Sequence, residues 1–145
     1  MNYNFEKNKP FMDVSFHDTE SDVINKLGYP EEIIIYENNG EEKSVWYQYD
    51  EDRCNVIFQY DHDKLDYLTF HTSCLYINGK DVFSFEKYRV LEIVKSISLI
   101  SLENALVESY EEFDILCESY NFDDIGLMLW FEDADLDDVC ISSPG

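Results

Sequence analysis

The chain of 145 residues has few basic residues, and it has none after Lys95. The fifty residues that follow Lys95 contain thirteen Asp and Glu, whereas the residues up to that point hold nineteen acids and all ten bases. The formal net charge is therefore −22 at pH 7. Because so negative a protein repels nucleic acid and anionic membranes, the charge argues against both as partners and favours a basic protein.

Glycine and proline are scarce, with five and three copies, so the sequence shows no linker and no low-complexity segment. No apolar run approaches the roughly eighteen residues that a membrane helix needs. Residues 1–10 are too polar for a signal peptide, which predicts a cytoplasmic protein. The length is typical of a single domain, 1–145.

Motifs for catalysis are missing as well. The sequence has no glycine-rich phosphate loop and no G-x-S-x-G element, its three histidines lie far apart, and its four cysteines form no C-x-x-C pair. We therefore predict no enzyme activity, no cofactor and four reduced, mostly buried thiols.

One acidic segment resembles the start of a calcium-binding loop. Asp133, Asp135 and Asp137 alternate along it, but the sixth loop position, normally Gly, is Asp138, and the twelfth, normally Glu, is Pro144. The segment is therefore predicted to be a solvated hairpin loop without a metal site, with weak binding of divalent cations as the alternative.

Apolar residues are abundant despite the charge. They make up 45% of the chain and include eleven Tyr, ten Phe and two Trp. Acidic chains stay disordered when they also lack apolar residues, so this composition predicts a folded domain with an acidic surface.

The first helix is predicted over residues 18–28. Thr19 and Asp22 have the spacing of a capping box, and Gly28 stands where the helix should end. A second helix is predicted to begin after an N-cap at Ser84, with Phe83 and Tyr88 spaced as a hydrophobic staple. Its buried stripe should consist of Val90, Leu91, Val94 and Ile97.

Four strands are predicted after each helix. The ranges are 32–36, 43–49, 54–60 and 65–72 in the first half, and 104–109, 112–118, 125–131 and 136–142 in the second. A small hairpin around Asn78 and Gly79 precedes the second helix.

The two halves also match without gaps between residues 56–73 and 127–144. We therefore predict two tandem units of one helix and four strands, at about 11–80 and 81–145. The expected fold is α+β, a predominantly antiparallel sheet of about eight strands with both helices on one face.

The other face of this sheet would then be open. Strand alternation places one set of polar and aromatic residues on it: Trp46, Gln48, Gln59, Tyr67, His71, Trp130 and Asp138. With Asp133 and Asp135 of the acidic loop, these residues form the predicted partner-binding surface, in which rings anchor and carboxylates select basic partners. Alternatively, the aromatic rings stabilise the sheet through cross-strand pairs or lie under a loop.

At the end of the first helix, residues 27–30 read Leu-Gly-x-Pro. This motif and the strands after it resemble the helix-plus-strands repeat of the beta-lactamase inhibitor protein fold, over residues 18–73 and less clearly 84–144. The chain as a whole resembles bacterial immunity proteins, including those of contact-dependent inhibition and other polymorphic toxin systems. The resemblance implies a protein, expected to be monomeric, that inhibits a basic toxin domain such as a nuclease. A DNA mimic and a module that binds a small molecule or metal are the alternatives.

Overall fold

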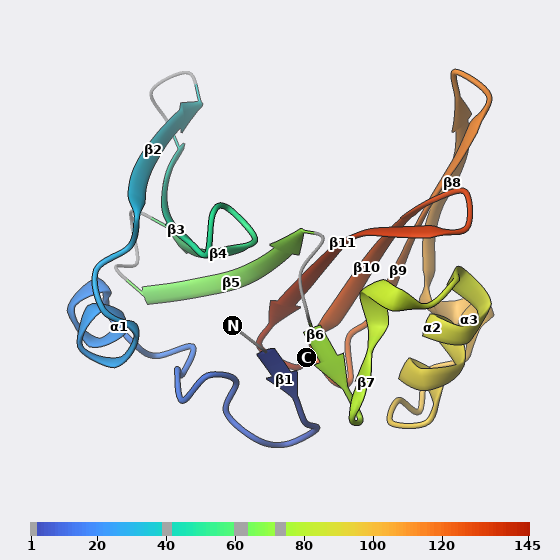
Figure 1. The fold of residues 1–145 in the computed structure, drawn as a ribbon, viewed down its shortest axis with the longest axis horizontal. Coiled ribbons are helices and arrows are strands. Elements are labelled where there is room, and N and C mark those ends of the chain that lie inside the picture. The colour runs from blue at the N-terminus through green and yellow to red at the C-terminus, as the bar shows by residue number, and fades with distance from the viewer. Residues whose placement is uncertain (1–2, 39–41, 60–63, 72–74) are drawn as a thin grey trace.

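The computed structural model describes residues 3–38, 42–59, 64–71 and 75–145. An eight-stranded antiparallel sheet is the largest element, and the helices and a small three-stranded sheet lie against one of its faces (Figure 1). The expected α+β fold is thus confirmed. Within these residues, none of the helices has the length and apolar composition that crossing a membrane requires.

In chain order the elements are β1 (Tyr3–Phe5), α1 (Glu20–Leu27), β2 (Glu32–Asn38), β3 (Glu42–Tyr49), β4 (Cys54–Gln59), β5 (Lys64–His71), β6 (Leu75–Ile77), β7 (Lys80–Asp81), a 3-10 turn (Val82–Ser84), α2 (Lys87–Lys95), α3 (Leu102–Ala105), β8 (Leu106–Glu112), β9 (Ile115–Phe122), β10 (Leu127–Glu132) and β11 (Asp135–Ser142).

The large sheet consists of two four-stranded meanders joined by their last strands. Its order is β2-β3-β4-β5-β11-β10-β9-β8, so each half of the chain supplies four adjacent strands. The first strand of each half, β2 or β8, is an edge of the sheet. In Figure 1 the β2–β3 and β8–β9 hairpins rise on opposite sides of the uncovered face as two arms.

The strands of the first half lie where the sequence predicts them, although Tyr60 and Thr72 fall outside the described residues. In the second half the expected start at Asn104 is wrong. Ser101 accepts a hydrogen bond from the amide of Asn104 (3.3 Å) and caps the helical turn α3, which delays β8 to Leu106.

The start of β10 also differs from the prediction at Ile125. Gly126 has a φ of 72°, and a Cβ atom there would lie 2.1 Å from the carbonyl oxygen of Ser142. Only glycine fits this close approach, so residues 125–126 form a turn and the strand begins at Leu127.

Helix α1 has the predicted caps. The Thr19 hydroxyl accepts from the Asp22 amide (3.3 Å), the Asp22 carboxylate accepts from the Thr19 amide (3.0 Å), and Gly28 follows the last turn. Tyr47 donates a hydrogen bond to Glu20 (2.7 Å), which fixes α1 on the covered face of the sheet.

The predicted start of the second helix is wrong. Ser84 closes the 3-10 turn and donates to the carbonyl of Asp81 (2.7 Å), while the Asp81 carboxylate caps that turn through the amide of Phe83 (3.2 Å). Phe85 is extended, so α2 begins at Lys87, and Tyr88 is too exposed to act as a staple. The predicted stripe is confirmed at Val90, Leu91 and Val94, which are buried, and Ile97 packs at the edge of the core after the helix ends.

The two meanders share a β-bulge at matching places. Asp66 is the extra residue of β5 opposite β4, and Asp137 is the extra residue of β11 opposite β10. Ile57 therefore occupies in β4 the place that Trp130 occupies in β10. The gapless sequence match between the two halves pairs Trp130 with Gln59 instead. The reason is that the chain between β4 and β5 is two residues longer than the chain between β10 and β11. Common ancestry of the two units remains a prediction.

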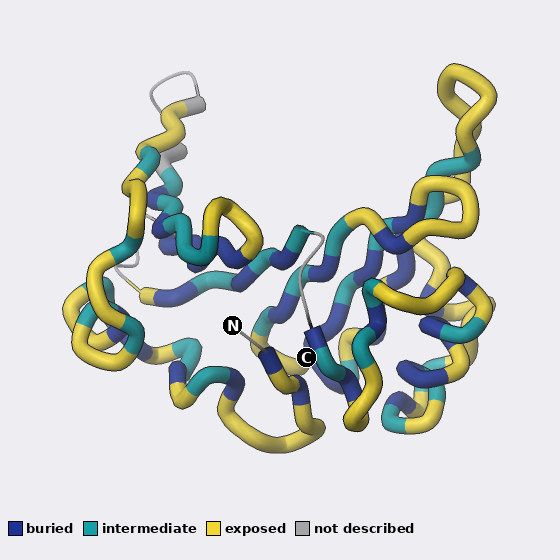
Figure 2. Tube along the Cα trace, viewed as in Figure 1, coloured by how far each residue is buried: buried dark blue, intermediate teal, exposed yellow. Residues whose placement is uncertain are grey.

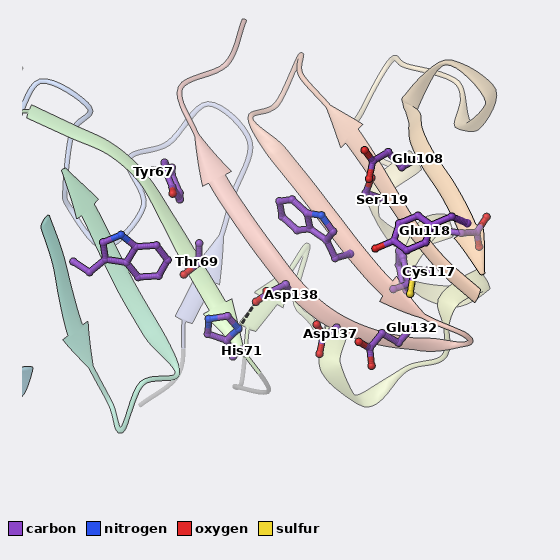
Figure 3. Close-up of a pocket in the computed structure, with 14 residues that line it drawn as sticks. Tyr67, Thr69, His71, Glu108, Cys117, Glu118, Ser119, Glu132, Asp137 and Asp138 are labelled. Carbon is purple, nitrogen blue, oxygen red and sulfur yellow. Dashed lines mark ion pairs between the residues drawn. The ribbon is translucent and has the colours of Figure 1, made fainter. Parts of the chain in front are cut away.

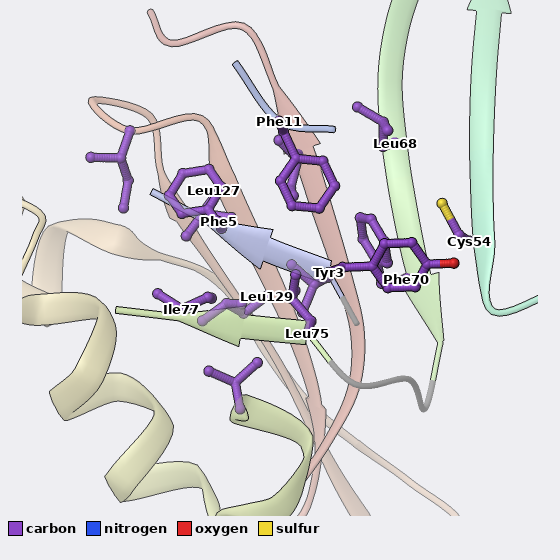
Figure 4. Close-up of a cluster of buried hydrophobic side chains, with 14 of the residues drawn as sticks. Tyr3, Phe5, Phe11, Cys54, Leu68, Phe70, Leu75, Ile77, Leu127 and Leu129 are labelled. Carbon is purple, nitrogen blue, oxygen red and sulfur yellow. The ribbon is translucent and has the colours of Figure 1, made fainter. Parts of the chain in front are cut away.

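The small sheet closes the core beneath the junction of the two meanders. The hairpin predicted around Asn78 and Gly79 is confirmed, since β6 and β7 pair on either side of these residues, whereas β1 was not predicted. Strand β1 pairs in parallel with β6, which pairs with β7. The Tyr3 ring lies 5.1 Å from that of Phe70 on β5, and Phe11 lies 5.3 Å from the same ring (Figure 4). Pairing with a strand seventy residues away is what makes a three-residue strand stable, and short local patterns do not encode it.

Truncation of Phe70 should therefore be severely destabilising. We expect Phe70→Ala to lower the free energy of unfolding by about 3–5 kcal/mol, because the ring is fully buried among other rings. Phe113→Ala, the same truncation at a 90% exposed site, should change it by less than about 0.5 kcal/mol. Denaturant unfolding measures both, and equal effects would contradict the assignment of the core.

Candidate functional site

The uncovered face of the large sheet contains a hollow of about 380 Å³ between the two arms. Figure 3 shows its walls, which come from both meanders. Its fourteen lining residues are Trp46, Tyr67, Thr69, His71, Glu108, Tyr110, Cys117, Glu118, Ser119, Trp130, Phe131, Glu132, Asp137 and Asp138.

Strand register explains how residues distant in sequence meet here. Asp138 of β11 pairs with His71 of β5 on one side and with Trp130 of β10 on the other. Trp130 in turn pairs with Ser119 of β9, so one row of residues crosses four strands. Since paired residues on adjacent strands share a face, a single alternation pattern aligns the row. The hollow therefore spans the line where β5 meets β11.

The two tryptophans of the chain both line the hollow, but their surroundings differ. The Trp46 ring stacks edge-on with Tyr36 at 5.2 Å, and its indole N–H donates to Ser44 (3.1 Å). Within the described residues, the half-buried side chain of Trp130 makes no hydrogen bond and no ring contact. Trp46 thus supports its own arm, as the cross-strand alternative suggests, whereas Trp130 offers its indole to the hollow.

Five carboxylates line the hollow, and among its described lining residues there is no Lys or Arg: Glu108, Glu118, Glu132, Asp137 and Asp138. Glu118 is neutralised from the covered side by the buried Lys87 of α2, whose pKa burial lowers. The hollow keeps a net negative charge, because its other four carboxylates face no Lys or Arg among the described lining residues.

The environment of Asp138 shifts the pKa of its carboxyl group. Burial raises its pKa to about 6, the neighbouring Asp137 and Asp52 add to the rise, and His71 opposes it through an ion pair between Nδ1 and Oδ1. Burial therefore disfavours the charged form of Asp138, and a cation beside the carboxylate would stabilise that form.

The β8–β9 arm forms one wall and extends well beyond it. Every residue of β8 is exposed, and Figure 2 shows the exposed colour along this arm. At its tip, Phe113 and Asp114 have φ values of 51° and 64°, and Phe113 is 90% exposed. An aromatic residue in a left-handed turn position is unfavourable, and the fold gains no packing from it in return.

The structure brings together five of the predicted residues: Trp46, Tyr67, His71, Trp130 and Asp138. Gln48 is on the same face one row away, opposite Asn55, and the side chain of Gln59 lies outside the described structure. Asp133 and Asp135 lie in the β10–β11 hairpin and do not line the hollow. Asp133 instead holds that hairpin to β9, accepting from the amide of Leu116 (2.9 Å).

Residues of β8 and β9 were missed because the predicted turn between these strands lies three residues too early. With the turn at Phe113 and Asp114, the alternation that follows places Tyr110 and Cys117 opposite each other on the hollow. The unusual density of acids and aromatic residues over 108–118 was the available signal.

The buried thiols of Cys140 and Cys54 are not nucleophiles. Burial raises the pKa of Cys140 to about 12 and that of Cys54, on the covered face, to about 12 as well. Both are therefore protonated at neutral pH, and a thiol is a poor nucleophile and metal ligand. Cys74 lies outside the described residues. In the part of the chain that is described, no three His, Cys, Asp or Glu side chains are arranged to hold a metal ion.

Comparisons with known proteins add no relative. No protein family, curated protein or solved structure matches the chain.

Asp138 should make the protein less stable as the pH rises. Its pKa is about 6 in the fold and near 4 in an unfolded chain, so the carboxyl is neutral in both states below about pH 4, and its penalty develops between about pH 4 and 6. We expect Asp138→Asn to raise the free energy of unfolding at pH 7 by about 1–2 kcal/mol and to have no effect near pH 4. Asp135→Asn, on the exposed side of the same strand, controls for the loss of one negative charge. A less stable Asp138→Asn protein at pH 7 would mean that the His71 pair outweighs burial.

Proposed function

We propose that this chain is an immunity-type protein of the cytoplasm that binds a basic toxin domain, such as a nuclease, and blocks its active site or substrate surface. The observation that carries the proposal is the hollow: a concave face with both tryptophans and five carboxylates, and without Lys or Arg among its described lining residues. Enzymes that act on nucleic acids have positive surfaces, because their substrates carry phosphates.

The net charge of −22 supports the same partner. A small domain needs a magnitude of only about 2–8 for solubility, and excess like charge destabilises the folded state. The excess negative charge would serve binding to a cationic surface, because it speeds association with basic proteins and disfavours acidic ones. Rapid capture is what an inhibitor of a toxin made in the same cell requires.

A DNA mimic is less well supported. Such a protein needs carboxylates spaced like phosphates on a convex surface, whereas here the carboxylates of the hollow line a concave one, interleaved with aromatic rings. Rings at the centre of a surface are typical of protein–protein contacts, in which Trp and Tyr contribute most of the binding energy.

The test of this proposal is neutralisation of a toxin. We expect the basic domain encoded next to this chain's gene to arrest growth when expressed alone and to be harmless when expressed with this protein. Trp130→Ala should weaken binding by more than about 1 kcal/mol and destabilise the fold less than Phe70→Ala does, because the indole is only half-buried and makes no described hydrogen bond or ring contact. Tyr88→Ala, a 72% exposed aromatic on α2 of the covered side, is the matched control. Calorimetry of the purified pair gives both affinities; full neutralisation by the Trp130 variant at unchanged affinity would remove the hollow from the interface.

The tip of the β8–β9 arm should show opposite effects on stability and binding. Phe113→Gly relieves the left-handed conformation and should raise the free energy of unfolding by about 1 kcal/mol. If Phe113 inserts into the toxin, the same change should weaken binding several-fold, and Phe113→Ala should weaken it without the gain in stability. A Phe113→Gly protein that binds as tightly as the parent would assign the exposed ring no role in the complex.

A further inference from the structure

The hollow has features that general attraction to a basic partner does not require. One row across the sheet places His71, Asp138 and Trp130 side by side, at the line where the two meanders join. The indole of Trp130 is unpartnered among the described residues, and Asp138 beside it is a carboxylate in a partly buried place. An aromatic face next to a carboxylate is a specific combination.

We propose that the hollow is a receptor for one arginine side chain of the partner, with the guanidinium against the Trp130 ring and hydrogen-bonded to Asp138. This inference rests on the proposed function for the identity of the partner, but the chemistry of the hollow itself selects the side chain.

Arginine fits better than lysine on three grounds. The guanidinium is planar and stacks on an indole face, it is more weakly hydrated than an ammonium group, and it presents five donors that bind a carboxylate through two parallel hydrogen bonds. An ammonium group has a compact charge that keeps its water, so a half-buried ring and carboxylate attract it less.

Two buried oxygen atoms lie beneath the hollow without hydrogen-bond partners in the described structure. The hydroxyl oxygen of Thr69, which lines the hollow, is buried and has no hydrogen-bond partner in the described structure. Asn55 pairs with Thr69 across the strands and is fully buried. Its side-chain oxygen also lacks a hydrogen-bond partner in the described structure, whereas its side-chain NH₂ group donates to Asp52 (3.0 Å). Buried polar atoms without partners are costly, so a donor-rich group that reaches these atoms would be stabilised.

The size of the hollow agrees with a single side chain. A volume of about 380 Å³ lies within the range of ligand sites and leaves room for an arginine side chain. A metal ion is a poorer occupant, because no three suitable ligands come together within the described residues.

The experiment uses the two tryptophans as the reporters, since both line the hollow and the chain has no others. The purified full chain is titrated with N-acetyl-arginine amide, the corresponding lysine amide and the corresponding citrulline amide, which is the neutral isostere of arginine. We expect a saturable change in emission with arginine, binding about tenfold weaker for lysine, and no saturable change for citrulline. A Trp46→Phe variant, in which only Trp130 remains, should keep the full arginine response.

Two variants complete the test. Asp138→Asn should weaken arginine binding about tenfold or more, whereas Asp135→Asn, which removes a charge outside the hollow, should leave it within about twofold. Equal affinity for arginine and lysine, or an unchanged affinity in Asp138→Asn, would overturn the proposal and leave only non-specific attraction.

The arginine site and the proposed function fail separately. If the chain neutralises the toxin domain but the amides do not bind, the inhibitor role stands and the arginine receptor falls. If arginine binds as expected but the toxin is not neutralised, the receptor stands and the partner must be another basic protein.

Discussion

The pairing of β5 with β11 is the constraint on which the rest of this structure depends. It joins the last strands of the two meanders, so the first strands, β2 and β8, are left as the edges and rise as arms. On the covered side the pairing brings Phe70 over the N-terminal strand, where Tyr3 packs on it. On the uncovered side it places His71 against Asp138 and creates the hollow.

The net charge of −22 opposes folding through repulsion between like charges. Two of the few basic residues reduce this repulsion by pairing with acids. Lys87 is committed to Glu118 and Lys26 to Asp18 (2.7 Å), so these two acids are paired at the edges of the core. Asp138 is paired as well, with His71, yet burial and the like charges of Asp137 and Asp52 raise its pKa. A site that retains so unfavourable a carboxylate is more readily explained by binding than by stability.

Local patterns in the sequence predicted local structure well. The capping box at Thr19 and the alternation of the first four strands need only neighbouring residues, and both are found. The errors arose where a side chain had a competing local partner. The Ser84 hydroxyl donates to the carbonyl of Asp81 in a 3-10 turn, so Ser84 does not cap the second helix. Ser101 caps a short helical turn, so β8 begins later than predicted. The pairing of β1 with β6 joins residues about seventy positions apart, so no window of residues could show it. The bulges at Asp66 and Asp137 lie within hairpins, but the alternation of apolar and polar residues does not mark the extra residue.

Some residues of the hollow were predicted, but the hollow itself was not. Alternation alone places Trp46 and Trp130 on the open face, but only the strand order shows that four strand-to-strand steps separate them across one concave surface. The difference between the two residues follows from this order. Trp46 lies near the edge strand β2, where Tyr36 engages its ring, whereas Trp130 lies inside the sheet beside Asp138, with no described ring contact. In the proposed complex, the half-buried ring of Trp130 contacts the partner, and the neighbouring carboxylate selects a cationic group of that partner.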